Sequence, residues 1–222
     1  MHIGWLIGAS GSSLLMFICF VIFSTINYKK RFSLKYDMRN HFPYEYNYDS
    51  SFKDNPFGNI CLLISMLFSL ALFSMTSAFF NVNGILIFCL IAGAIYSIIA
   101  FFIVFVSLKR ITLHVVCAVL LSCFAFLTPS SIGLAAFQHY QKTKSVICLI
   151  LFILCVIVGL FNFALIMNPK FTFNIKMKKI KLNNGEEQVV RPNIIVIAFS
   201  EWMMLFSLFV TQVLLIVTIV NL

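Results

Sequence analysis

Charged residues are scarce in this chain. Asp, Glu, Lys and Arg together make up 10% of its 222 residues, whereas a soluble domain carries about 25%. This shortage excludes a water-soluble core. Acidic residues are the rarer kind, with 7 against 16 basic ones, so the formal net charge is +9. In a soluble protein that excess would suggest a nucleic-acid partner. The chain contains no recognisable nucleic-acid-binding module, and we expect no such partner.

Paired cysteines and catalytic motifs are missing as well. All seven cysteines lie in apolar segments and none forms a CxxC pair, so we interpret them as small packing residues. The sequence has no Walker glycine loop, no HExxH motif, and no Ser or Cys nucleophile with a base close by. It therefore predicts no metal site, no cofactor and no enzymatic activity.

Long apolar segments are abundant. Six of them exceed the roughly 20 residues that a helix needs to cross a ~30 Å hydrocarbon layer. They lack the period-two alternation of a membrane barrel, so each is expected to be a helix. The predicted fold is an all-α polytopic membrane protein, a single membrane domain over 1–222 with a six-helix transmembrane bundle and a small cytoplasmic β-hairpin. The expected spans are about 3–27, 59–80, 84–107, 111–137, 145–167 and 194–220.

The basic residues are distributed very unevenly between the loops. Three loops, all on one side of the predicted spans, hold 14 of the 16, and the other side holds only Lys142 and Lys144. Lys and Arg remain on the cytoplasmic side of a membrane. Loops 28–58 and 168–193 are therefore expected in the cytoplasm, near anionic lipid headgroups of the bilayer. The localisation that follows is the plasma membrane, with both termini outside.

The two long cytoplasmic loops have patterns of their own. Residues 28–58 mix nine aromatic residues with cations, which suits either a lipid-facing interfacial segment or a docking surface for a protein partner. In 170–192, apolar and polar residues alternate on both sides of Asn184-Gly185. Alternation around Asn-Gly predicts a β-hairpin. Such a hairpin would extend the docking surface.

A few polar residues lie inside the spans. Glu201 is the only charged one, and intramembrane carboxylates are functional candidates. Gln212 shares its helical face. His114 and Asn162 lie at a similar depth in the membrane to Glu201. If the three helices are neighbours, these residues are expected to meet and form a transport or proton site. Two other interpretations remain open: Glu201 extends to the headgroups beside an interfacial Trp202, or it makes a structural hydrogen bond inside the bundle.

Two further patterns concern helix packing. Gly4, Gly8 and Ser12 recur every four residues in the first span, and small residues at this spacing let helices approach closely. The partner helix belongs either to the same chain or to another subunit. In the fourth span, Pro129 removes a backbone donor and predicts a kink. Neighbouring hydroxyl groups are expected to satisfy the freed carbonyls.

Two functions are compatible with these observations. The first is a non-catalytic membrane component that docks a partner through residues 28–58 and 170–192. The alternative is a small-solute or ion transporter whose site includes Glu201, His114 and Asn162. A pocket reaching Glu201 favours transport, whereas a packed bundle with an ordered cytoplasmic face favours docking.

The orientation can be tested with a cysteine at the C-terminus. In Leu222→Cys we expect labelling by a membrane-impermeant thiol reagent in intact cells, because the positive-inside rule places this end outside. A cysteine at Lys35, in a basic loop, serves as the matched control and is expected to react only after the cells are opened. Labelling with the reverse pattern contradicts the orientation.

Overall fold

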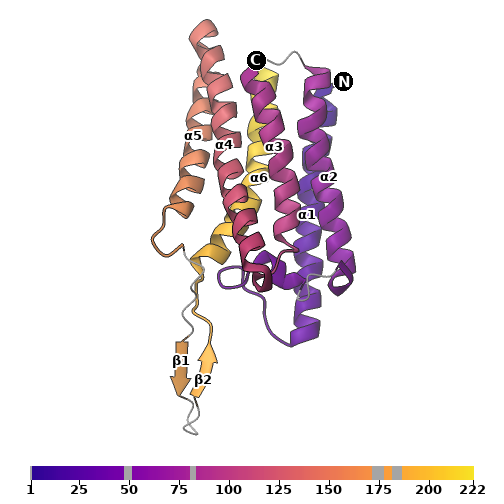
Figure 1. Ribbon diagram of the computed structural model, residues 1–222. Coiled ribbons are helices and arrows are strands. Elements are labelled where there is room, and N and C mark those ends of the chain that lie inside the picture. The colour runs from indigo at the N-terminus through magenta and orange to yellow at the C-terminus, as the bar shows by residue number, and fades with distance from the viewer. Residues whose placement is uncertain (1, 48–51, 81–83, 172–177, 182–186) are drawn as a thin grey trace.

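Six long α-helices form the computed structural model, which describes residues 2–47, 52–80, 84–171, 178–181 and 187–222 (Figure 1). Each helix is long and apolar enough to cross a membrane, so the prediction of an all-α fold with six spans is confirmed. The helices are α1 (His2–Phe32), α2 (Pro56–Phe79), α3 (Gly84–Ile103), α4 (Ile111–Thr143), α5 (Val146–Ile166) and α6 (Val196–Asn221). Short 3₁₀ turns cover Pro43–Tyr46 (η1), Phe52–Asp54 (η2) and Leu108–Arg110 (η3).

Both termini lie at one end of the bundle (Figure 1). The opposite end, here called the basic end, carries the connections 33–55, 104–110 and 167–195 between helices. Consecutive helices pack against each other from α1 to α5, and α6 contacts α1, α3, α4 and α5. Helix α6 is therefore the central helix of the bundle, and polar side chains on it face protein rather than lipid.

Helix boundaries differ from the predicted ones where polar residues follow an apolar run. Helix α1 continues to Phe32 and ends where Ser33 takes a left-handed conformation, with φ of 55°. Helix α4 continues to Thr143 and ends at Lys144, with φ of 57°. Hydropathy indicates which residues lie in the hydrocarbon layer, and it does not indicate where a helix ends. The polar extensions of α1 and α4 therefore continue as helix beyond the predicted spans. Helix α3 instead ends four residues early, at Ile103.

Two four-residue strands lie between α5 and α6. Strand β1 (Lys178–Lys181) pairs antiparallel with β2 (Glu187–Val190), in a register from Lys178 opposite Val190 to Lys181 opposite Glu187. They project away from the helices at the basic end (Figure 1). The predicted turn at Asn184-Gly185 and most of the alternating segment before β1 lie outside the described residues. The hairpin as a complete unit therefore remains a prediction.

Helices α1 and α2 pack through serines rather than through the predicted glycines. The Ser13 hydroxyl donates to the Ser65 carbonyl at 2.8 Å, and the Ser65 hydroxyl donates to the Ser13 carbonyl at 2.6 Å. By contrast, Gly4 and Gly8 are exposed, and a Cβ added to either meets no heavy atom within 4 Å in the described part of the chain. Ser12 is half-buried. Within the described part of the chain, the prediction that Gly4 and Gly8 pack closely against another helix is therefore wrong, whereas for Ser12 it stays a prediction. The alternative, contact with another subunit, stays a prediction.

Asn162 compensates for the proline inside α4. Pro129 has no N–H group to donate to the carbonyl of Ala125, four residues earlier. The Asn162 side-chain amide, from α5, donates to that carbonyl at 3.0 Å and to the Ser207 hydroxyl of α6 at 2.7 Å. Thr128 and Ser130 donate to the carbonyls of Phe124 and Phe126, so hydroxyl bonds are present near the proline but, contrary to the prediction, do not reach the freed carbonyl of Ala125. Asn162 therefore joins three helices at the point where the proline weakens one of them.

This arrangement predicts a rescue between two positions. Asn162→Leu should lower the free energy of unfolding by about 1–3 kcal/mol, because it leaves the Ala125 carbonyl without a donor in an apolar interior. In the background of Pro129→Ala, which restores the helical N–H, the same substitution should cost clearly less. Unfolding of the four proteins in mixed micelles measures this difference. Equal costs in both backgrounds contradict the assigned role.

Candidate functional site

A segment from the basic end folds back onto the bundle. We call residues 36–47 the capping segment. Tyr36, Phe42 and Tyr46 are all buried within it, and the Tyr36 and Tyr46 rings stack with centroids 4.1 Å apart. The interpretation of 28–58 as lipid-facing is wrong for these three residues. They pack against protein because the N-terminal part of α6 carries a buried aromatic residue, Trp202. Its ring contacts both tyrosines.

The capping segment begins with a tight turn. Asp37 accepts hydrogen bonds from the backbone N–H of Arg39 at 2.9 Å and from its guanidinium at 2.8 Å. These bonds lower the pKa of Asp37 to about 2, so the turn keeps its charge pattern at any physiological pH. The backbone N–H of His41 closes the turn on the carbonyl of Asp37 at 3.0 Å. Local bonds thus set the path of the chain toward the bundle axis.

Bonds from α6 and the residues before it hold the capping segment in place. The backbone N–H of Ile195 donates to the Arg39 carbonyl at 2.8 Å. The indole N–H of Trp202 donates to the His41 carbonyl at 3.0 Å. Arg191 binds both carboxylate oxygens of Glu45, at 2.8 and 2.9 Å. Burial alone would lower the pKa of Arg191, but Glu45 raises it overall, so the guanidinium stays charged.

The end of the segment is held by amides. Asn47 and Asn59 exchange side-chain hydrogen bonds at 3.1 and 2.7 Å. The Asn47 amide also donates to the carbonyl of Val104 at 3.3 Å, just beyond the last residue of α3. A side chain from the capping segment thus takes over an acceptor at this helix end, where α3 stops earlier than predicted.

Glu201 forms a buried ion pair with His114 directly below the capping segment. The His114 Nε2 atom lies 2.9 Å from Glu201 Oε1 and joins α4 to α6. Glu201 is 1% exposed and Trp202 is fully buried. The interpretation in which Glu201 extends to the headgroups beside an interfacial Trp202 is therefore wrong. The central position of α6 directs both residues inward.

Hydrogen bonds around the pair restrict where its protons lie. His114 Nδ1 is 2.6 Å from the Val106 carbonyl, which can only accept, so Nδ1 carries a proton. One further proton lies between Nε2 and Oε1. The pair is then neutral overall, either as imidazolium and carboxylate or as imidazole and carboxylic acid. Its second oxygen, Oε2, is buried and accepts no hydrogen bond from a described residue, which leaves one site for another proton or a cation.

The other two predicted site residues lie elsewhere. Asn162 is committed to Ala125 and Ser207, as described above. The Gln212 amide donates to the Ser69 hydroxyl of α2 at 2.8 Å, and Ser69 in turn bonds Ser97 of α3 at 2.7 Å. The expected cluster of Glu201, His114 and Asn162 therefore reduces to the pair of Glu201 and His114. The hydrogen bonds of Asn162 and Gln212 to described residues all go to other partners.

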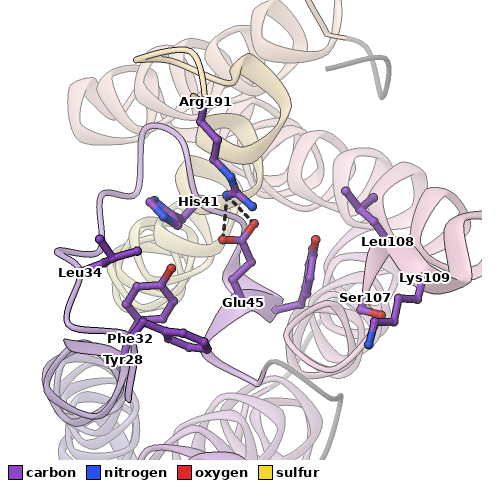
Figure 2. A pocket seen from close by; sticks show the side chains of 10 residues that line it. Tyr28, Phe32, Leu34, His41, Glu45, Ser107, Leu108, Lys109 and Arg191 are labelled. Carbon is purple, nitrogen blue, oxygen red and sulfur yellow. Dashed lines mark hydrogen bonds and ion pairs between the residues drawn. The ribbon is translucent and has the colours of Figure 1, made fainter. Parts of the chain in front are cut away.

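A pocket of about 500 Å³ opens at the basic end, above the pair. Figure 2 shows Arg191 and Glu45 facing each other in it, with Tyr28 and Phe32 on one side and Lys109 on another. Its lining combines apolar or aromatic with polar side chains: Tyr28, Phe32, Leu34, Leu108 and Tyr44, and His41, Glu45, Ser107, Lys109 and Arg191.

Tyr44 connects this pocket to the buried pair. It lines the pocket, and its ring packs edge-on against the His114 imidazole with centroids 5.4 Å apart. Phe42 makes a similar contact at 5.7 Å. Burial, followed by the charge of Glu45, raises the pKa of Tyr44, so it remains a neutral phenol. One layer of aromatic rings separates the pocket from the pair.

Sequence reasoning did not find Tyr44, Glu45 or Arg191 as site residues. Glu45 and Arg191 lie in different loops, 146 positions apart, and no local pattern relates them. Among the described residues no group of three or more His, Cys, Asp or Glu side chains is placed to hold a metal ion.

The fold and the site define a multi-pass α-helical membrane protein with a polar pair in its core. No family model, curated protein or solved structure matches the chain. Function must therefore be argued from the geometry of the pair and the pocket.

The pair predicts strong coupling between two substitutions. Glu201→Leu and His114→Leu alone should each destabilise the protein, on the order of 3 kcal/mol, because each leaves a buried polar partner unpaired. The double variant should cost less than the sum, since it buries neither charge. A double-mutant cycle of unfolding free energies in mixed micelles measures the coupling. Simple additivity would show that the two side chains do not depend on each other.

Proposed function

We propose that the protein is a membrane transporter of a small solute in which His114 and Glu201 handle a proton. The observation that supports this function is the placement of the pair. An ion pair lies inside two membrane spans, one layer of rings away from a pocket open at the basic end. Ionisable groups inside a membrane bundle are costly and mark ion pathways and proton relays.

The protonation pattern of the pair suits this role. A neutral pair is compatible with the apolar interior, whereas adding a proton at Oε2 creates a net positive charge there. A buried charge of that kind is unfavourable unless an anion or water approaches it. Proton uptake would thus favour a conformation in which the pair is open to the pocket or to the other side of the membrane.

The capping segment would act as the movable cover. Its Phe42 and Tyr44 rings pack against His114, and its polar contacts with Arg191, Ile195 and Trp202 would break when it moves. The conformation described here corresponds to a closed state in which Glu201 is inaccessible. Movement of η1 away from His114 would open a path from the pocket to the pair.

An ordered basic end also fits the other function, docking of a protein partner through residues 28–58 and 170–192. The bonds that hold the capping segment produce a defined surface rather than a mobile loop. Docking alone leaves the buried pair and the pocket above it without a role, so we place it second.

The test is electrogenic or proton-coupled transport in proteoliposomes. Under an imposed proton gradient, addition of pooled small solutes should produce currents or internal pH changes that Glu201→Gln abolishes, because the amide cannot take up a proton. Lys142→Gln, which neutralises an exposed charge at the opposite end of the bundle, should retain them. Absence of any response, together with a stoichiometric protein partner that copurifies in mild detergent, would reject transport in favour of docking.

A further inference from the structure

The basic-end pocket has two chemically different parts. Tyr28, Phe32 and Leu34 supply an aromatic and apolar wall, while Arg191 and Lys109 supply cations (Figure 2). Among the described residues of the lining, Glu45 is the only acidic one. A ligand that matches both parts carries an apolar body and a negative group.

Arg191 is the residue best placed to bind the negative group. Its side chain is 40% exposed, whereas that of Glu45 is 10% exposed. The side-chain hydrogen bonds of Arg191 to described residues all come from Nη1, to Glu45 and to the Asn40 carbonyl. Its Nε and Nη2 groups donate to no described residue. A guanidinium presents donors in a planar fork that matches phosphate and carboxylate oxygens, and part of this fork remains available.

Glu45 already shows what Arg191 binds. It places a carboxylate on the guanidinium from within the chain, as an internal competitor for an incoming anion. Lys109 provides a second cationic side chain among the described lining residues. The pocket also lies at the end of the bundle where 14 of the 16 basic residues are found in the sequence, the end expected at the phosphate layer of the membrane.

We propose that this pocket binds an amphiphilic phosphate, with the phosphate on Arg191 and the apolar body against Tyr28, Phe32 and Leu34. The ligand is either a membrane phospholipid or a soluble phosphorylated amphiphile. This inference deepens the proposed function, because it names the substrate class of the same site. Binding would weaken the contact between Arg191 and Glu45, one of the bonds that hold the capping segment over His114.

The test uses octyl phosphate as the probe and the full-length protein in nanodiscs of neutral phosphatidylcholine. Saturable binding is expected, with octyl glucoside and inorganic phosphate binding far more weakly. Glu45→Gln should tighten octyl phosphate binding about tenfold, because the anion no longer competes with the carboxylate, and Arg191→Gln should weaken it about tenfold. Lys142→Gln, which removes a cation at the opposite end, should leave the affinity unchanged.

The opposite response to Glu45→Gln overturns the proposal. If binding weakens in that variant, or if octylammonium binds in place of octyl phosphate, the pocket is not an anion site. Because Arg191→Gln leaves Glu45 unpaired, thermal unfolding is recorded for each variant. The double variant Glu45→Gln/Arg191→Gln keeps the pocket free of this unpaired charge and should still bind weakly. Octyl phosphate affinity equal to that of the unchanged protein in the double variant also overturns the proposal.

Native mass spectrometry of the purified protein distinguishes the two sources of ligand. A phospholipid that copurifies, is displaced by octyl phosphate and is lost in Arg191→Gln identifies the lipid. Octyl phosphate binding without a retained lipid identifies a soluble amphiphile. Binding without any transport response overturns the proposed function and leaves this inference standing, whereas transport without octyl phosphate binding overturns the inference alone.

Discussion

The structure depends on one constraint: a polar group inside an apolar bundle must find its partner within the protein, because the hydrocarbon layer supplies none. Pro129 illustrates it most directly. The proline frees a carbonyl in α4, and Asn162 from α5 satisfies that carbonyl while also binding Ser207 of α6. One unfavourable residue thereby determines the contacts between three helices. The serine pair of α1 and α2 and the Gln212–Ser69 bond follow the same rule on the other side of α6.

The same constraint explains why the basic end is closed. Trp202 and Glu201 lie on the central helix within the first two turns of α6, where their polar atoms would otherwise face an open end. The indole N–H of Trp202 donates to the His41 carbonyl of the capping segment, and the Glu201 carboxylate pairs with His114. The capping segment is therefore part of the core. Its tyrosines and phenylalanine replace the lipid that would have contacted the top of α6.

Spans, their even number and the identity of the buried pair could be predicted from the sequence, because each depends on local hydropathy or on a rare residue in an apolar run. Glu201 is the only charged residue in any of the spans predicted from the sequence, and His114 lies at a similar depth in its own span. The role of Asn162 could not be predicted, since it depends on a proline 33 positions earlier in a neighbouring helix. The prediction that Gly4 and Gly8 of α1 pack against another helix of this chain was wrong for a related reason. Periodicity shows that residues share a face, and it does not show which helix that face meets.

Two ion pairs stand at different depths in this molecule, and their difference bears on mechanism. Glu45 and Arg191 line the pocket, with Arg191 partly exposed, and this is where the proposed anion would replace the carboxylate. Glu201 and His114 lie in the core, where only a proton or a small cation can change the charge. Tyr44, next in sequence to Glu45, lies between them and touches His114. In the proposed function, a change in the outer pair would move Tyr44, and its contact with His114 would couple the binding of an anion to the buried proton.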